Sequence, residues 1–145
     1  MSLLSALSIS ASGMSAQRQR TELLVENLAN SDTTRTPEGG PYRRKDAVFI
    51  SDPEVAQFSS LFESEMGSSG TGVRVADVVT DTRDPDKRYL PGHPDADKDG
   101  YVAYPRLNPA EEMVDLLGAS RGYQANVSAI SAVKDMIQRS LDLFR

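Results

Sequence analysis

The side chains most able to do chemistry stand in one short acidic tract. Asp95, Asp97 and Asp99 alternate along the chain, Gly100 follows, and an apolar residue comes two positions later. This spacing matches the first half of an EF-hand calcium loop, where acidic side chains ligate the ion and Gly makes the sharp turn. Such a loop needs a bidentate Glu at its twelfth position, but Arg106 stands there and its positive charge opposes calcium. We therefore expect a polar turn between two strands and no metal site; a small calcium-binding module remains the weaker alternative.

The other candidate for chemistry is His93, the only histidine of the chain. A hydrolase built on it would need an orienting partner and a nucleophile, and the sequence has no G-x-S-x-G nucleophile elbow. There is no Cys, which excludes thiol catalysis, disulfides and thiolate metal sites. We expect His93 to be a turn residue, and we expect neither an enzyme nor a cofactor.

The charge of the chain also limits its partners. Its 21 acidic and 16 basic residues give a net charge of −5, which disfavours binding to nucleic acid. The basic cluster Arg43-Arg44-Lys45 has two interpretations: a solvated face, or a surface that pairs with acidic neighbours. No apolar run approaches the roughly 20 residues that span a bilayer, so we expect no membrane insertion. The N-terminus also lacks the basic region and cleavage site of a secretory signal peptide.

Two long helices are predicted at the chain ends. The first runs from about Leu3 to Asn30, and the second follows Asn108, whose side chain can cap it ahead of Pro109. Apolar residues recur at alternating spacings of three and four in both segments, a pattern typical of coiled coils. The N-terminal ridge consists of Leu4, Leu7, Met14, Val25 and Leu28. The C-terminal ridge consists of Met113, Leu116, Tyr123, Val127, Ile130, Ile137 and Leu141.

These helices are unusual for a chain of 145 residues. The second would be roughly 50 Å long at 1.5 Å per residue, far above the mean helix of about 11–12 residues. We expect an antiparallel coiled-coil pair whose ridges could face each other. The first helix is rich in Ser and contains Gly13, so alone it is weak, and we infer that it is buried when subunits pack together. Gly118 and Gly122 allow close packing either within one subunit or among many.

The middle of the chain differs in kind. Segments near 42–50 and 73–79 and short pieces at Tyr89 and 101–104 predict strands, with a hairpin turn at Asp99-Gly100. A weak helix at 53–62 and a flexible loop at 67–72 are also expected. The fold class is therefore mainly α with a small β part. Its parts are an N-terminal coiled-coil helix (1–30), a β-rich or irregular middle domain (31–108) and a C-terminal coiled-coil helix (109–145).

A polar tract follows the first helix. Asn27, Asn30, Thr33 and Thr34 can cap the helix and fix the turn that leaves it, because short polar side chains bond to nearby backbone groups. A generic solvated loop is the alternative.

Several tracts carry a family resemblance. Residues 12–17 and 26–34 (SGMSAQ and ENLANSDTT) resemble the N-terminal signature of flagellar rod and hook proteins. The tracts GGPYRR at 39–44 and PGHPDAD at 91–97 are similar to a proximal-rod subunit in particular, as is ASRGYQANV at 119–127. The resemblance covers nearly the whole chain; a different flagellar rod subunit is the alternative within it.

The resemblance implies a structural role. Proteins of this family leave the cell unfolded through the flagellar type III export apparatus and polymerise into the hollow drive shaft that crosses the periplasm. Their terminal helices form its inner tube, and the middle segment forms an outer domain. The implied partners are other copies of the chain, the rod proteins FlgB, FlgF and FlgG, and the export-gate adaptor FliE. This agrees with the weak terminal helices and the missing catalytic set.

Overall fold

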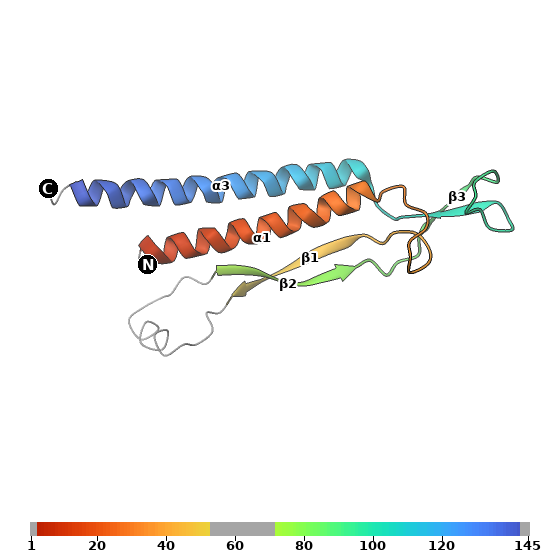
Figure 1. The fold of residues 1–145 in the computed structure, drawn as a ribbon, viewed down its shortest axis with the longest axis horizontal. Helices are drawn as coiled ribbons and strands as arrows, with labels where there is room; N and C mark the ends of the chain where they lie inside the picture. The colour runs from red at the N-terminus through yellow and green to blue at the C-terminus, as the bar shows by residue number, and fades with distance from the viewer. Residues whose placement is uncertain (1–2, 53–71, 143–145) are drawn as a thin grey trace.

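The protein is an elongated helical hairpin with two small β-hairpins attached (Figure 1). The computed structural model describes residues 3–52 and 72–142. The elements are α1 (Leu3–Ala29), β1 (Lys45–Asp52), β2 (Gly72–Thr80), β3 (Asp86–Tyr89), β4 (Tyr101–Tyr104) and α3 (Pro109–Asp142). The prediction of a mainly α protein with a small β part is confirmed. The weak helix at 53–62 and most of the loop at 67–72 lie outside the described residues.

The two helices lie side by side and run in opposite directions, so the start of α1 and the end of α3 are at the same end of the molecule (Figure 1). The predicted start of α3 is confirmed, because the Asn108 Oδ1 atom accepts a hydrogen bond from the Ala110 N–H at 3.1 Å. The Asn108 amide donates to Glu111 Oε1 at 3.3 Å, so these two side chains form a variant of a capping box. Over these described residues α3 has 34 residues and α1 has 27.

The first β-hairpin lies along α1, on the side away from α3 (Figure 1). β1 and β2 pair antiparallel from Lys45 opposite Thr80 to Asp52 opposite Gly72, with a bulge between Val48 and Phe49. Ser12 links α1 to this sheet, because its hydroxyl accepts a hydrogen bond from the N–H of Val73 in β2 at 3.1 Å. A Cβ atom at Gly72 would lie 2.7 Å from the Ser12 hydroxyl, so the close approach requires Gly.

The second β-hairpin extends beyond the helix ends. β3 and β4 pair antiparallel from Asp86 opposite Tyr104 to Tyr89 opposite Tyr101. Asp99-Gly100 does not form a tight two-residue turn; instead residues 90–100 connect the strands, and Gly100 has a φ of 83° just before β4. The hairpin itself is as predicted, but its connection is longer, because Asp97 organises a second turn inside it.

The apolar core is small for two such long helices. Among the described residues, the buried apolar side chains are Ala16, Leu24, Tyr42, Val102, Ala119 and Val133. Two polar side chains are buried as deeply, with Asn27 at 0% exposure and Glu112 at 2%. The packing between the helices therefore depends on small and polar side chains as well as on apolar burial.

Candidate functional site

The contact line between the two helices is polar and narrow. A Cβ atom at Gly13 would lie 2.9 Å from the Asn126 side chain, and one at Gly122 would lie 3.2 Å from the Gln17 side chain. Nearer the start of α3, the Arg20 guanidinium and the Asp115 carboxylate form an ion pair at 3.5 Å. Small and polar residues thus bring the two backbones close together, as glycine does elsewhere at tight packing sites.

This contact line runs one residue before the predicted ridges in both helices. In α1, Gly13 and Asn27 directly precede the ridge residues Met14 and Leu28. In α3, Glu112, Gly122 and Asn126 directly precede the ridge residues Met113, Tyr123 and Val127. A coiled-coil pairing in which the two ridges face each other is not shown by these contacts and stays a prediction.

The ridges lie beside the contact line and are only partly covered. Val25 is 49% exposed, Met113 52%, Tyr123 37%, Val127 40% and Leu141 63%. Leu7, Met14, Leu28, Leu116, Ile130 and Ile137 are of intermediate exposure. The side chain of Leu4 lies outside the described residues. Val114 at 68% and Leu117 at 60% extend the uncovered apolar surface of α3. Exposed apolar residues on a soluble protein are typical of sites that contact another molecule when they gather in a patch.

A buried polar junction joins α1, β1 and α3. The Asn27 amide donates to the Lys45 carbonyl at 2.9 Å and to Glu112 Oε2 at 3.1 Å. Its Oδ1 atom accepts from the Lys45 N–H at 3.0 Å and from the Tyr42 hydroxyl at 2.9 Å. All four hydrogen-bonding positions of this amide are used. Asn27 thus bonds the backbone of Lys45 as a second strand neighbour of β1 would, instead of capping α1 as the sequence suggested.

Glu112 supplies the charge that completes the junction. Its Oε1 atom accepts from Arg44 Nε at 2.5 Å, and Arg44 also pairs with Asp46 and, at 3.8 Å, with Asp115. Lys45 reaches Glu26 Oε1 at 2.5 Å. Two members of the basic cluster at 43–45 therefore form ion pairs inside the chain, and neither of the two earlier interpretations describes them.

The Tyr42 hydroxyl in this junction is predicted to make stability pH-dependent. Burial, together with the charges of Glu26 and Glu112, raises the pKa of Tyr42 to about 12 from 10.0. The contribution of Tyr42 to the free energy of unfolding is fully present below pH 10. It falls as the Tyr42 hydroxyl ionises in the unfolded chain, and it is lost as the pH rises through 12. Urea unfolding measured between pH 9 and 11 should show this slope in the wild type. In Tyr42→Phe the slope should be smaller, and equal slopes would contradict the prediction.

The rest of the linker tract fixes the exit from α1. The Asn30 amide donates to the Glu26 carbonyl at 2.9 Å, and the Thr33 hydroxyl donates to Asn30 Oδ1 at 3.1 Å. The Thr34 hydroxyl reaches further and meets Asp95 Oδ2 at 2.8 Å. Asn30 and Thr33 therefore shape the turn, as expected, while Thr34 ties it to the loop of the second hairpin.

The acidic tract and His93 form a self-bonded loop. Asp97 Oδ1 accepts from the N–H groups of Asp99 and Tyr101 at 3.0 and 2.8 Å. Asp95 holds Thr34 and pairs with Arg35 at 3.8 Å. His93 Nδ1 accepts from the Asp95 N–H at 3.1 Å. Over residues 3–52 and 72–142, no three side chains of the kinds that bind metals gather. These hydrogen bonds are consistent with the interpretation as a polar turn that contains His93.

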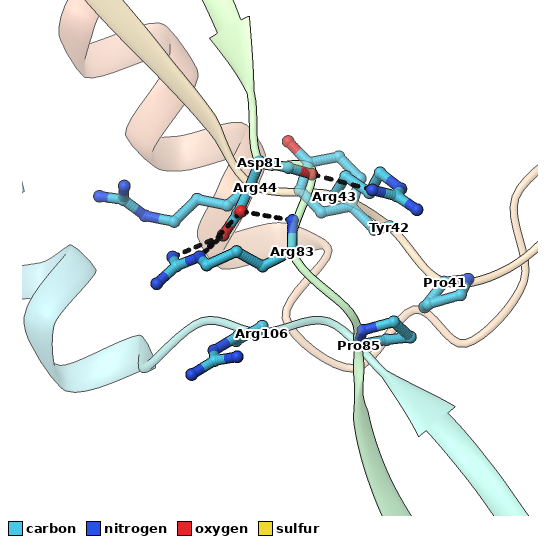
Figure 2. Close-up of a pocket in the computed structure, with 8 residues that line it drawn as sticks. All are labelled: Pro41, Tyr42, Arg43, Arg44, Asp81, Arg83, Pro85 and Arg106. Carbon is cyan, nitrogen blue, oxygen red and sulfur yellow. Dashed lines mark hydrogen bonds and ion pairs between the residues drawn. The ribbon is translucent and has the colours of Figure 1, made fainter.

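An arginine pocket lies where the strands meet the start of α3 (Figure 2). It is lined by Pro41, Tyr42, Arg43, Arg44, Asp81, Arg83, Pro85 and Arg106. Arg83 Nε and Nη2 donate hydrogen bonds to the Asp81 carboxylate at 2.9 and 2.6 Å. These bonds lower the pKa of Asp81 to about 2. Arg43 donates to the Asp81 carbonyl at 3.1 Å. The pocket volume is about 10 Å³, room for roughly one water molecule.

Sequence reasoning missed Glu112, Tyr42 and the pocket around Asp81. The partners of Glu112 lie 85 and 68 positions away in the chain, so no local pattern reports them. The one available signal was that a carboxylate stood on the helix face next to the ridge.

In the part of the chain that the structure describes, no helix is both long and apolar enough to cross a membrane.

Comparisons with known proteins agree across the whole chain. Residues 7–35 match the family model "Flagella basal body rod protein", and residues 98–143 match "Flagellar basal body rod FlgEFG protein C-terminal". Similar proteins include the flagellar basal-body rod protein FlgC of Bacillus subtilis, 41% identical over 99% of both chains. The FlgC proteins of Borreliella burgdorferi and Escherichia coli are 38% and 40% identical, over 100% and 99% of this chain and 99% and 98% of their own.

Proposed function

The chain belongs to the FlgC family of flagellar basal-body rod proteins, and we propose that its two apolar ridges join it to neighbouring subunits of the proximal rod. It is a structural subunit of the bacterial flagellar basal body. Its relatives are structural rod proteins. The finer steps below concern how this chain assembles.

The observation that carries the proposal is the partly uncovered pair of ridges. Val25, Met113 and Val127 remain between 40% and 52% exposed, although apolar residues recur along both helices. Fully burying a side chain of this size contributes roughly 1.5–3 kcal/mol, so covering both ridges would stabilise an assembly strongly. The narrow polar contact within the subunit leaves this surface for coiled-coil packing against other helices.

The remaining parts of the proposal rest on the family to which the chain belongs. The helices at 1–30 and 109–145 form the inner tube, and the middle segment 31–108 forms the outer part. Partners in the rod are other copies of the chain and FlgB, FlgF and FlgG, with FliE at the export gate. The subunit reaches the periplasm through the flagellar type III apparatus. The small apolar core supports this route, because little buried surface has to be exposed to unfold the chain before export.

The test separates assembly from folding. Val25→Gln and Val127→Gln change exposed residues, so the stability of the purified monomer should change by less than about 0.5 kcal/mol in urea unfolding. A strain that carries either variant in place of the wild type should assemble few rods and fail to swim. Val79→Gln is the matched control, because Val79 on β2 is 50% exposed but lies off the ridges. Normal swimming of the double ridge variant would refute the proposal.

A further inference from the structure

Part of the backbone edge of β1 has no strand beside it. β2 lies along one edge of β1, and on the other edge the N–H and C=O groups of Lys45 bond to the Asn27 side chain. Groups that face this second edge recur at every second residue, so those of Ala47 and Phe49 face the same way. Within the described part of the chain, no hydrogen bond reaches the edge-facing groups of these two residues. The edge of β1 is therefore open beyond Lys45.

The outer edge of β2, in contrast, is protected. The Val78 N–H donates to the Asp77 side chain at 2.8 Å, and the Val73 N–H donates to Ser12. The extra residue of the bulge lies in β2 as well. Proteins protect exposed strand edges with bulges and side chains of this kind, because an open edge pairs with strands of other molecules. Of the two edges, that of β1 is the one suited to receive a strand.

A groove of about 240 Å³ lies between α1 and the open edge of β1. Four of its seven lining residues are apolar, namely Leu23, Leu24, Ala47 and Phe49. Directly opposite residues of two antiparallel strands have their side chains on the same face. A strand that paired with Ala47 and Phe49 would therefore direct every second side chain toward this groove, which has room for one large apolar or aromatic group.

β3 has the features that this edge requires. All four of its residues are exposed, and the side chain of Tyr89 is 63% exposed. The Leu90 N–H donates to the Gly100 carbonyl beside β4, so the backbone groups of Lys87 and Tyr89 face the other way. β3 therefore has an open edge of its own, and a large aromatic side chain stands at one of its edge-facing residues.

We propose that β3 of one copy of this chain adds to the open edge of β1 in a second copy, with Tyr89 in the groove. The inference rests on the proposed function, because it requires rod subunits that point the same way. In Figure 1, β1 runs toward the end where α1 starts, whereas the second hairpin extends beyond the opposite end of the molecule. Copies that share one direction therefore bring β3 and β1 together antiparallel.

Charge complementarity favours a second copy as the source of this strand. When Tyr89 is opposite Ala47, Arg88 is opposite Val48. On its other side Val48 pairs with Asp77 of β2. Arg88 and Asp77 are exposed, and neither forms an ion pair among the described residues. On the enlarged sheet their Cα atoms would be about 10 Å apart on one face, which the long Arg88 side chain can span.

The second charged pair fixes the register. With Tyr89 opposite Ala47, Asp86 is opposite Ile50, and Ile50 pairs on its other side with Arg74. An acid and a base thus match across β1 for a second time. A shift of β3 by two residues would place Arg88 beside Arg74 in this position, and like charges across an interface disfavour contact. A shift the other way would require Lys45, whose edge is taken by Asn27.

Engineered thiols test the pairing, because the chain has no Cys of its own. Ile50→Cys and Asp86→Cys stand at a non-hydrogen-bonded pair of the proposed register, where Cα atoms about 4.5 Å apart suit a disulfide. Rods from a strain that expresses both single variants should yield, after mild oxidation, a disulfide-linked dimer with one chain of each kind. Lys98→Cys in the loop of the same hairpin replaces Asp86→Cys as the control and should not link. Assembled rods without the mixed dimer, or with dimers of two Ile50→Cys chains, would overturn the inference.

Tyr89→Ala tests the groove. Because this side chain is exposed, the melting temperature of the purified subunit should change little, while the strain should assemble at least about tenfold fewer rods. Tyr89→Phe keeps the ring and should assemble as the wild type does. Equal numbers of rods in the Tyr89→Ala and Tyr89→Phe strains would contradict the inference. If Val25→Gln and Val127→Gln abolish swimming while Tyr89→Ala does not, the proposed function stands and this inference alone fails.

Discussion

Replacing Glu112 by Ala is expected to destabilise the subunit by about 3 kcal/mol, which is a large fraction of the stability of a domain this size. Glu112 is 2% exposed and accepts from both Arg44 and Asn27. Its loss would leave the Arg44 charge, whose side chain is 22% exposed, with only its partly exposed partners Asp46 and Asp115. It would also leave one buried N–H of Asn27 without an acceptor, and each such group costs about 1–3 kcal/mol. Urea unfolding of the purified monomer measures the change.

The neighbouring residue provides a matched control. Glu111 also lies in the first turn of α3 and has the same favourable interaction with the helix dipole, but its side chain is exposed. Glu111→Ala should therefore cost less than about 1 kcal/mol. In an Arg44→Ala background, Glu112→Ala should lower the free energy of unfolding by a smaller amount. The reason is that the Arg44 charge, which would otherwise lose its buried partner, is absent. If Glu112→Ala and Glu111→Ala lowered the free energy of unfolding equally, the polar junction would contribute no stability beyond the interaction of each glutamate with the helix dipole.

Local sequence signals were enough to predict the helices and strands. The capping residues around Pro109 and the apolar spacing placed α1 and α3 within a few residues of their observed ends over the described chain. The alternating Val residues located β2 in the same way. β1 begins at Lys45 and not near Tyr42, because Tyr42 turns its hydroxyl toward Asn27 before the strand starts.

The antiparallel arrangement of the helices was expected, but the residues that meet between them could not be predicted, because they lie far apart in the sequence. The spacing of apolar residues identifies the more apolar face of each helix, but it does not indicate which part of the molecule that face contacts. Whether Gly13 meets Asn126, or Asn27 meets Glu112, is decided by the whole hairpin. Asn27 illustrates the limit, since an Asn near a helix end usually forms short-range bonds, whereas its partners here are Tyr42, Lys45 and Glu112.

The glycines of the two helices differ in what surrounds them, and this difference predicts opposite effects on folding and assembly. Gly13 and Gly122 approach side chains of the partner helix, so the close packing within one subunit accounts for them. A Cβ atom at Gly118 would meet nothing within 4 Å. Exposed Val114 and Leu117 flank this open position. Gly in a helix costs about 1 kcal/mol relative to Ala, so a reason for Gly118 must lie outside the subunit.

Gly118→Leu is therefore expected to stabilise the monomer and yet abolish rod assembly. The helix should gain up to about 1 kcal/mol in urea unfolding, because Leu forms helices nearly as well as Ala and has open space here. In the rod, its side chain would hold a neighbouring helix away from α3, and a strain with this variant should not swim. Gly118→Ala should give the same gain in stability with a milder loss of swimming. Gly13→Ala should gain less than either, since its Cβ must displace the Asn126 side chain, which is bonded to the Gly122 carbonyl at 2.9 Å. A Gly118→Leu strain that swims normally would show that the outer face of α3 is not packed against another helix.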